Sequence, residues 1–483
     1  MTPSLILGII GLYFLVLLGI SLKTGSQDDN QTFFTANKNA KWYIVAFGMV
    51  GTSLSGVTFI SVPGWVQSSQ FTYFQVVLGY GVGYWLVSFV LLPLYYKQGL
   101  TSIYEYLAER FGPKSHLVGA LSFFISRTLG AAFRLFLVAI VLQQYVFAQL
   151  GIPFEITVVL SVALIWFYTH RGGIKTIVWT DSLQTLLMII AVVLSIVYMG
   201  QNLNLSTAEI FSLDSYPDYN RIWIFDDPSH RQYFWKAFIG GAFITLCMTG
   251  LDQDMMQKNL SCRNLREAQK NMLSFSLVLV GVTALFLLLG ALNYNYAAAN
   301  SIALPVLNGS PRTDLLFPEI ALNSNLGAVV GGTFILGLIA AAYSSADSAL
   351  AALTTSYCID WLKLPAEAIA PKRRKKIHLG MSALLVGVVI VFYYVLSSNV
   401  IDSLLTVASY TYGPLLGLYS FGMFTSYKID DNKVVWVCVS VLILVIGLAN
   451  LPVSYLGGYQ FGYELLPLNG LLTFLGLVLI RRK

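Results

Sequence analysis

Apolar stretches of membrane-spanning length recur along the whole chain, with short polar segments between most of them. A helix needs about 20 consecutive apolar residues to cross the hydrocarbon layer of a bilayer. Charged residues make up only 11% of the chain, whereas an average soluble domain carries about 25%. The sequence therefore predicts an all-α, polytopic membrane protein whose helices lie in a lipid bilayer.

Hydropathy predicts about thirteen membrane spans. Their ranges are 3–22, 42–66, 72–97, 117–148, 154–170, 176–200, 236–253, 271–297, 325–357, 377–397, 400–426, 432–450 and 462–480. The first apolar stretch has no basic segment before it and no small-residue cleavage site after it, so we expect a retained span and not a signal peptide.

The distribution of basic residues predicts how the chain is oriented. If the N-terminus lies outside, the outer loops hold only Arg221, Arg231, Lys236 and Arg312 of the 29 Lys and Arg residues. Arg127 and Arg134 fall within a span, and the others, Lys258 among them, fall on the inner side, where Lys and Arg accumulate in membrane proteins. We therefore expect a plasma-membrane protein (the inner membrane in a bacterium) with its N-terminus outside, its C-terminus in the cytoplasm and no nucleic-acid partner.

Two predicted spans contain residues that interrupt helices. Span 42–66 includes "GMVGTSLSGVTFISVPGW", and span 236–253 includes "GGAFITLCMTGLDQD". Each begins a block of five spans, and paired interrupted spans of this kind are typical of transporters built from inverted repeats. An unwound turn also frees backbone carbonyls, which are ligands that small hard cations prefer. The alternative is that the glycines only allow helices to pack closely.

Polar and small residues form one face of the predicted span around residues 340–356, "AAAYSSADSALAALTTS". At about 100° per residue, this face holds Ala341, Ser344, Ser345, Ser348, Ala352 and Thr355, with Asp347 at its edge. Hydroxyls and carbonyls together suit Na⁺, because they provide oxygen ligands with little negative charge. The alternative is a packing seam in which each serine bonds to the carbonyl four residues back.

Several motifs together resemble the sodium:solute symporter family, whose members include sodium/glucose, proline, sialic acid and iodide carriers. The matching stretches are "TSLSGVTFISVPG", "TSIYEYLAERFG", "GGIKTIVWTDSLQ", "DQDMMQKNLSCRN", "AAAYSSADSAL" and "YGPLLGLYSFGMF". They run in family order from about residue 40 to residue 425. The resemblance implies a leucine-transporter-type fold with inverted five-helix repeats, which works by alternating access.

This organisation predicts five segments of the chain. They are 1–41, an N-terminal extra helix and inner loop; 42–200, the first repeat; 201–235, an extracellular loop; 236–426, the second repeat; and 427–483, two C-terminal helices. We expect the protein to function as a monomer.

The resemblance also implies a main Na⁺ site between the spans at 42–66 and 325–357. The matching ligands in this sequence are the carbonyls of Gly51, Leu54 and Ala341 and the hydroxyls of Ser344 and Ser345. They include the serine face described above, so the residue pattern and the resemblance predict the same site.

Some relatives, notably the sialic acid carriers, use a second Na⁺ site, and its matching residues here are Asp181, Ser344, Asp347 and Ser348. Asp347 stands where those carriers have a serine. Two carboxylates near one ion either bind it more tightly or leave one of them protonated, so a second bound Na⁺ is an open question. Asp181 alternatively steadies the start of its helix or pairs with a nearby base.

Substrate contacts are expected beside the interrupted helix. The candidates are Ser53, Ser55, Thr58 and Gln75, with Tyr80 in the same space, and Arg134. Arg127 and Arg134 lie seven residues apart, on one helix face, and arginine binds carboxylates with two parallel hydrogen bonds. The pair therefore predicts an anionic substrate such as an acidic sugar or organic acid. The alternative is that the two arginines cap backbone carbonyls or neutralise an aspartate such as Asp252 or Asp254. The sialic acid carriers have their arginine at the position of Gly130, so that residue does not carry over.

The sequence predicts a Na⁺-driven symporter that imports a small organic solute: a sugar, an acidic sugar such as sialic acid, or an organic acid. The alternatives are a Na⁺-coupled carrier of a small inorganic or monocarboxylate anion, and a transporter-like membrane sensor. Tyr410 and Tyr412 are candidate gate residues, or else pack in the interior. An enzyme is not expected, because the 4 histidines are scattered and form no paired motif.

Overall fold

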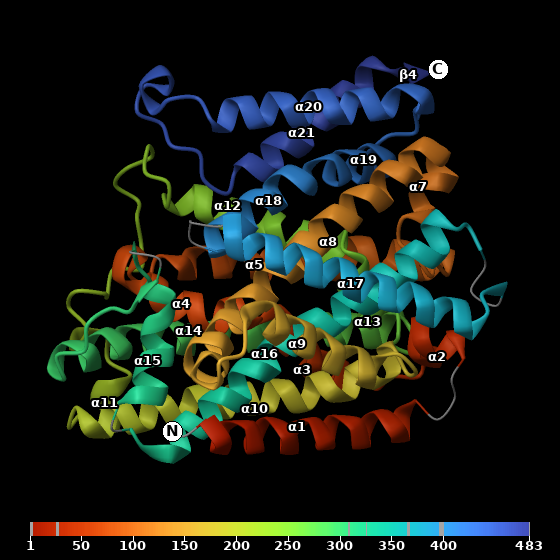
Figure 1. Ribbon diagram of the computed structural model, residues 1–483. Coiled ribbons are helices and arrows are strands. Elements are labelled where there is room, and N and C mark those ends of the chain that lie inside the picture. Colours follow the sequence, from red (N-terminus) through yellow and green to blue (C-terminus); the bar gives the residue numbers. More distant parts are fainter. Residues whose placement is uncertain are drawn as a thin grey trace.

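The computed structural model describes residues 3–25, 29–307, 310–324, 326–364, 368–395 and 400–482, and it is built almost entirely of helices (Figure 1). Within these residues, 8 helices are long and apolar enough to cross a membrane, or up to 10 if each of two bent pairs is one span. The predicted multi-pass, all-α membrane protein is therefore confirmed.

The long helices lie where hydropathy predicts them. They are α1 (Pro3–Thr24), α5 (Tyr73–Leu86) continuing to α6 (Leu92–Gln98), α8 (Pro113–Leu142), α10 (Ile174–Asn202), α14 (Leu265–Ala299), α16 (Gly327–Ser356), α17 (Pro371–Val395) and α20 (Val434–Ala449). Shorter apolar helices are α9 (Phe154–Thr169), α18 (Val400–Thr411), α19 (Gly413–Phe424) and α21 (Leu465–Leu479).

Both interrupted spans are bent in the structure. Helix α3 (Trp42–Ser53) is followed by α4 (Gly56–Ser69) at an angle of 54°. Helix α12 (Phe234–Thr245) continues as a π-helical turn to Gly250 and is followed by α13 (Gln253–Asn259) at 69°. The sequence predicts that the span beginning at residue 236 ends at residue 253, whereas in the structure the chain continues past the break as the buried helix α13.

Short elements connect these helices. They are α2 (Asn30–Thr35), α7 (Glu105–Arg110), α11 (Thr207–Ile210), α15 (Leu316–Asn323) and two antiparallel pairs, β1 (Val306–Leu307) with β2 (Ser310–Pro311), and β3 (Lys428–Ile429) with β4 (Arg481–Arg482). The segment 201–235 folds over one end of the molecule, where Phe71 N donates to Arg221 O at 3.1 Å.

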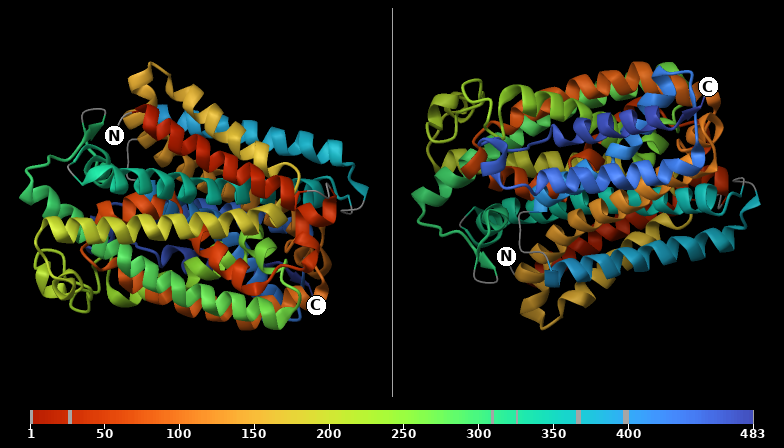
Figure 2. Two further views of the ribbon diagram at one scale, coloured as in Figure 1. Left: turned by 90° about the horizontal axis from the view of Figure 1, so that it is seen from below. Right: turned by 90° about the horizontal axis from the view of Figure 1, so that it is seen from above.

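Helix α16 lies in the middle of the molecule. It packs along α10 and also contacts α3, α4 and α8, and the left view in Figure 2 shows α10 (yellow) and α16 (teal) side by side. Every residue from Gly337 to Ser356 is buried. The serine face therefore contacts other helices and not lipid, which explains how its polar groups are satisfied in a membrane. Helices α1 and α20 lie at opposite edges (Figure 1).

Candidate functional site

The break between α3 and α4 consists of Leu54 and Ser55. Leu54 has φ −82° and ψ 73°, and Ser55 has φ −73° and ψ 178°, so neither residue is helical. Helix α4 then begins at Gly56, where an added Cβ would lie 2.7 Å from Val138 Cγ2 of α8. The glycine therefore lets the broken helix pass close to α8 while backbone groups at the break leave the helical pattern.

The serine face of α16 meets α3 just before this break. Ser345 Oγ donates to Thr52 O at 3.2 Å and lies 3.4 Å from Ala341 O, and Ser344 Oγ lies 3.2 Å from Thr52 Oγ1. All these residues are buried. The structure thus brings Ala341, Ser344 and Ser345 against the end of α3 that holds Gly51.

Asp181 of α10 also belongs to this cluster and contacts both α3 and α16. Its Oδ1 accepts a hydrogen bond from Ser344 Oγ at 2.7 Å, and its Oδ2 accepts one from Thr52 Oγ1 at 3.0 Å. Gly51 is needed here, because an added Cβ would lie 2.2 Å from Thr185 Oγ1 on the same α10. Three helices far apart in the sequence therefore present oxygen atoms to one buried region.

Lys258 of α13 also enters this cluster, which the sequence analysis did not anticipate. Its Nζ lies 2.5 Å from Asp181 Oδ2 and donates to Thr52 Oγ1, and its side chain is 1% exposed. The expectation that Lys258 is an inner-loop residue is therefore wrong, and Asp181 pairs with a base. One signal in the sequence could have indicated this burial. Lys258 lies in "DQDMMQKN", directly after the predicted break, where the chain continues as a short buried helix.

Asp347 and Ser348 make a separate set of contacts. Tyr168 OH of α9 donates to Asp347 Oδ2 at 2.8 Å, and Ser348 Oγ lies 3.1 Å from Asp347 Oδ1 and 2.8 Å from Ser344 O. The side chains of the four residues predicted for a second ion site therefore form two pairs, Asp181 with Ser344 and Asp347 with Ser348, which the contact between Ser348 Oγ and Ser344 O joins.

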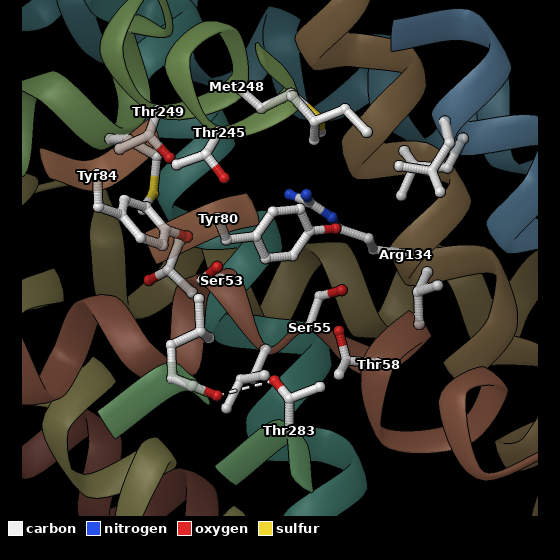
Figure 3. A pocket seen from close by; sticks show the side chains of 18 of the residues that line it. Ser53, Ser55, Thr58, Tyr80, Tyr84, Arg134, Thr245, Met248, Thr249 and Thr283 are labelled. Atoms are coloured by element: carbon white, nitrogen blue, oxygen red, sulfur yellow. Dashed lines mark hydrogen bonds between the residues drawn. The ribbon is translucent and has the colours of Figure 1, made fainter. Parts of the chain in front are cut away.

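A cavity of about 100 Å³ lies beside the α3–α4 break and is a separate space from the cluster around Asp181 (Figure 3). Its walls include Ser53, Ser55, Thr58, Tyr80, Arg134 and Thr283. These residues come from the α3–α4 break and from α5, α8 and α14. Predicted substrate-contacting residues from three separate spans thus line one space.

Arg134 points into this cavity (Figure 3) and is only 7% exposed. Its Nε and Nη1 have no hydrogen-bond partner, and no carboxylate of the described residues lies within salt-bridge distance of it. Arg127, two turns earlier on the same face of α8, is different: it is paired with Asp254, and its Nη1 lies 4.0 Å from Asp252 Oδ2. The neutralising role that the sequence left open therefore applies to Arg127.

Three other candidates lie away from the cavity. Gln75 is buried, but its Nε2 donates to Gln232 O at 3.0 Å and its Oε1 accepts from Ile224 N at 3.1 Å, so its amide fixes segment 201–235. The prediction that Gln75 faces the cavity is corrected by this placement. Tyr412 OH donates to Asp252 in the interior, whereas Tyr410 lines a second cavity beside α20 and α21.

Comparison with known proteins gives consistent matches. The model of the sodium:solute symporter family matches residues 33–431. The chain is 25% identical over 446 residues to the sodium/sialic acid symporter NanT of Aliivibrio fischeri, covering 89% of this chain and 83% of NanT. It is 27% identical over 441 residues to the human sodium/iodide cotransporter, covering 86% of this chain and 65% of that protein.

The solved structure of a Na⁺-coupled sialic acid symporter, in a substrate-bound outward-open state, has a similar fold. It aligns with a TM-score of 0.80 at 21% sequence identity and covers 98% of this chain and 97% of that one. The similarity therefore extends over nearly all of the chain.

Proposed function

Because this chain belongs to the sodium:solute symporter family, we propose that it imports a small organic anion together with Na⁺ by alternating access. It is a multi-pass membrane transporter and not an enzyme, and Na⁺ is its coupling ion. The single observation that supports an anionic solute is the buried, unpaired guanidinium of Arg134 in the cavity.

An unpaired charge in a low-dielectric interior is unfavourable unless a partner neutralises it. Both arginines line the cavity, but Arg127 has such a partner in Asp254, whereas Arg134 has none among the described residues. A solute carboxylate can accept two parallel hydrogen bonds from the guanidinium. We propose that Arg134 binds the carboxylate and that Ser55 and Thr58 orient the rest of the solute.

The size of the cavity favours a short organic acid. Its volume is about 100 Å³, smaller than the ~150 Å³ apolar cavity that holds a benzene molecule. A monocarboxylate of a few carbon atoms fits this space in the conformation described, whereas an acidic sugar needs the cavity to widen. Sialic acid is the second candidate, because NanT of Aliivibrio fischeri and the solved structure above are sialic acid symporters by name.

We propose that the main Na⁺ site uses the carbonyls of Gly51, Leu54 and Ala341 and the hydroxyls of Ser344 and Ser345. The contacts between α16 and α3 support this assignment, because they bring Ser345 to Thr52 O and Ala341 O. Inward movement of one Na⁺ supplies about 2.3 kcal/mol per 100 mV of membrane potential. Bound Na⁺ joins α3 to α16, so its binding and release are expected to bias the transporter between its two open states.

The finer topology is also a proposal. The helices support about thirteen spans, with the two bent pairs beginning inverted repeats at 42–200 and 236–426. We propose that the protein lies in the plasma membrane (the inner membrane in a bacterium), with its N-terminus outside and its C-terminus in the cytoplasm. We also propose that the functional unit is a monomer. Helix α13 then lies on the cytoplasmic side, and its complete burial indicates that this side is closed.

The experiment is Na⁺-driven uptake into proteoliposomes, with labelled short monocarboxylates, acidic sugars, neutral sugars and iodide as solutes. We expect an inward Na⁺ gradient to drive monocarboxylate uptake. Arg134→Gln should raise KM for the acid about 10- to 100-fold, because a hydrogen bond to a charged group contributes roughly 1.5–3 kcal/mol. Arg134→Lys should have an intermediate effect, because it keeps the charge but loses the two-pronged geometry.

Lys97→Met is the matched control, because Lys97 is an exposed cation at the end of α6 and away from the cavity. Transport restricted to neutral sugars, or a KM for the acid that Arg134→Gln leaves unchanged, would contradict the assignment of Arg134. Uptake independent of Na⁺ would contradict the proposed coupling itself.

A further inference from the structure

We propose that the Lys258 ammonium occupies the position of a second monovalent cation beside Asp181, so that one Na⁺ accompanies each solute molecule. This inference rests on the proposed function and specifies its Na⁺ stoichiometry. In this arrangement no second Na⁺ binds near Asp181, because a side chain of the protein itself supplies the second positive charge.

The contacts of Asp181 resemble those of a carboxylate that holds a cation. Lys258 Nζ lies 2.5 Å from its Oδ2, and the same Nζ donates to Thr52 Oγ1. The other oxygen, Oδ1, accepts from Ser344 Oγ at 2.7 Å. The ammonium thus contacts one carboxylate oxygen and one hydroxyl oxygen, the kinds of ligand that a bound Na⁺ also requires.

Lys258 is held in this place by the rest of α13. The neighbouring Gln257 Nε2 donates to Phe34 O at 2.7 Å and to Thr355 Oγ1 at 2.9 Å. Asn259 Oδ1 accepts from Asn271 Nδ2 at 2.7 Å. Side-chain hydrogen bonds of the residues on both sides of Lys258 thus hold α13 in place, with the ammonium at Asp181.

A Na⁺ ion added at Asp181 would share one carboxylate with the ammonium. Both groups are buried, with side-chain exposures of 1% for Lys258 and 0% for Asp181, and like charges repel strongly where water does not screen them. The other carboxylate, Asp347, has different hydrogen-bond partners, since Tyr168 OH donates to its Oδ2 at 2.8 Å and Ser348 Oγ lies 3.1 Å from its Oδ1.

The test measures how many Na⁺ ions enter with each solute molecule, from parallel fluxes of radioactive Na⁺ and labelled solute in proteoliposomes. We expect the native protein to move one Na⁺ per solute, with a hyperbolic Na⁺ dependence. Lys258→Met vacates the position at Asp181, so we expect a second Na⁺ per solute and a sigmoidal Na⁺ dependence. Lys258→Arg and the surface control Lys97→Met should both retain one Na⁺.

The double variant Asp181→Asn with Lys258→Met separates this role from a general disturbance of α13. It removes the carboxylate as well as the ammonium, so we expect it to return to one Na⁺ per solute. A native stoichiometry of two Na⁺ overturns the inference and leaves Na⁺ symport intact. A folded Lys258→Met protein that still moves one Na⁺ also overturns it, and if that variant does not fold, the native stoichiometry decides.

Discussion

Two arginines on helix α8 differ in whether they have an acidic partner, and this difference suggests different roles for them. Arg127 is paired with Asp254 and lies 4.0 Å from Asp252 through its Nη1. Both arginines line the cavity, but no carboxylate of the described residues lies within salt-bridge distance of Arg134. Since removing one partner of a buried ion pair leaves an uncompensated charge, we interpret Arg127 as part of the packing around α13 and Arg134 as the group available to a solute.

At the same scale, Ser345→Ala is expected to raise the Na⁺ concentration that gives half-maximal uptake by about 5- to 10-fold. The change removes one proposed oxygen ligand, and a hydrogen bond or ligand of this strength contributes roughly 1 kcal/mol. Na⁺ titration of solute uptake measures it. Thr333→Ala on the same helix is the control, because Thr333 is half-buried and its Oγ1 donates only within its own helix, to Val329 O at 2.8 Å and Val330 O at 3.1 Å. Equal Na⁺ requirements in the two variants would contradict the role of Ser345.

At the scale of elements, glycines set how closely helices approach one another. Helices α5 and α12 pack along each other, and an added Cβ at Gly79 of α5 would lie 2.1 Å from Phe238 O of α12. The contact is reciprocal, since a Cβ at Gly241 of α12 would lie 2.2 Å from Val76 O of α5. Small residues let backbones approach in this way inside a membrane, where the hydrophobic effect does not drive helices together.

Gly79→Ala is therefore expected to destabilise the protein by about 1–3 kcal/mol, the usual range for overpacking a tight interface. Gly81, two residues further along α5, has open space around it, with nothing within 4 Å of an added Cβ. Gly81→Ala should be neutral or stabilising by up to about 1 kcal/mol, because alanine favours helix over glycine. Denaturant unfolding in detergent measures the free energy of unfolding of both variants. An equal loss of stability in the two variants would contradict the role of close packing between α5 and α12.

At the scale of the whole molecule, one end is closed by contacts between distant segments. Gln253, at the start of α13, accepts from Ile103 N at 2.9 Å and donates to Thr101 O at 2.8 Å. Tyr419 OH of α19 donates to Ile103 O at 2.6 Å. These contacts join both predicted repeats at the α13 end, which we propose faces the cytoplasm because of the distribution of basic residues. Opening this end for release requires them to separate.

The orientation is tested by thiol labelling in intact cells with a membrane-impermeant maleimide. The four native cysteines are buried, which keeps background labelling low. Ser229→Cys, in segment 201–235, should react from outside, whereas Asn432→Cys, between α19 and α20, should react only after the membrane is permeabilised. Both positions are exposed, so access depends on the side of the membrane. The opposite labelling pattern would reverse the proposed topology.

The sequence by itself determined the features that depend on neighbouring residues. Apolar length located the helices, glycine and hydroxyl residues located the breaks in α3–α4 and α12–α13, and helical periodicity placed Ser344 and Ser345 on one face with Ala341. These properties are local, because a few adjacent residues decide whether a segment spans a membrane or leaves the helical pattern.

The tertiary structure alone decided which distant polar groups meet. Lys258 looked like a loop cation yet pairs with Asp181, Gln75 holds a loop instead of facing the cavity, and only one of two equivalent-looking arginines has an acidic partner. The physical reason is that a buried charge or amide takes the partner that packing brings to it. That partner lies on another helix far along the chain, so neither periodicity nor hydropathy specifies it.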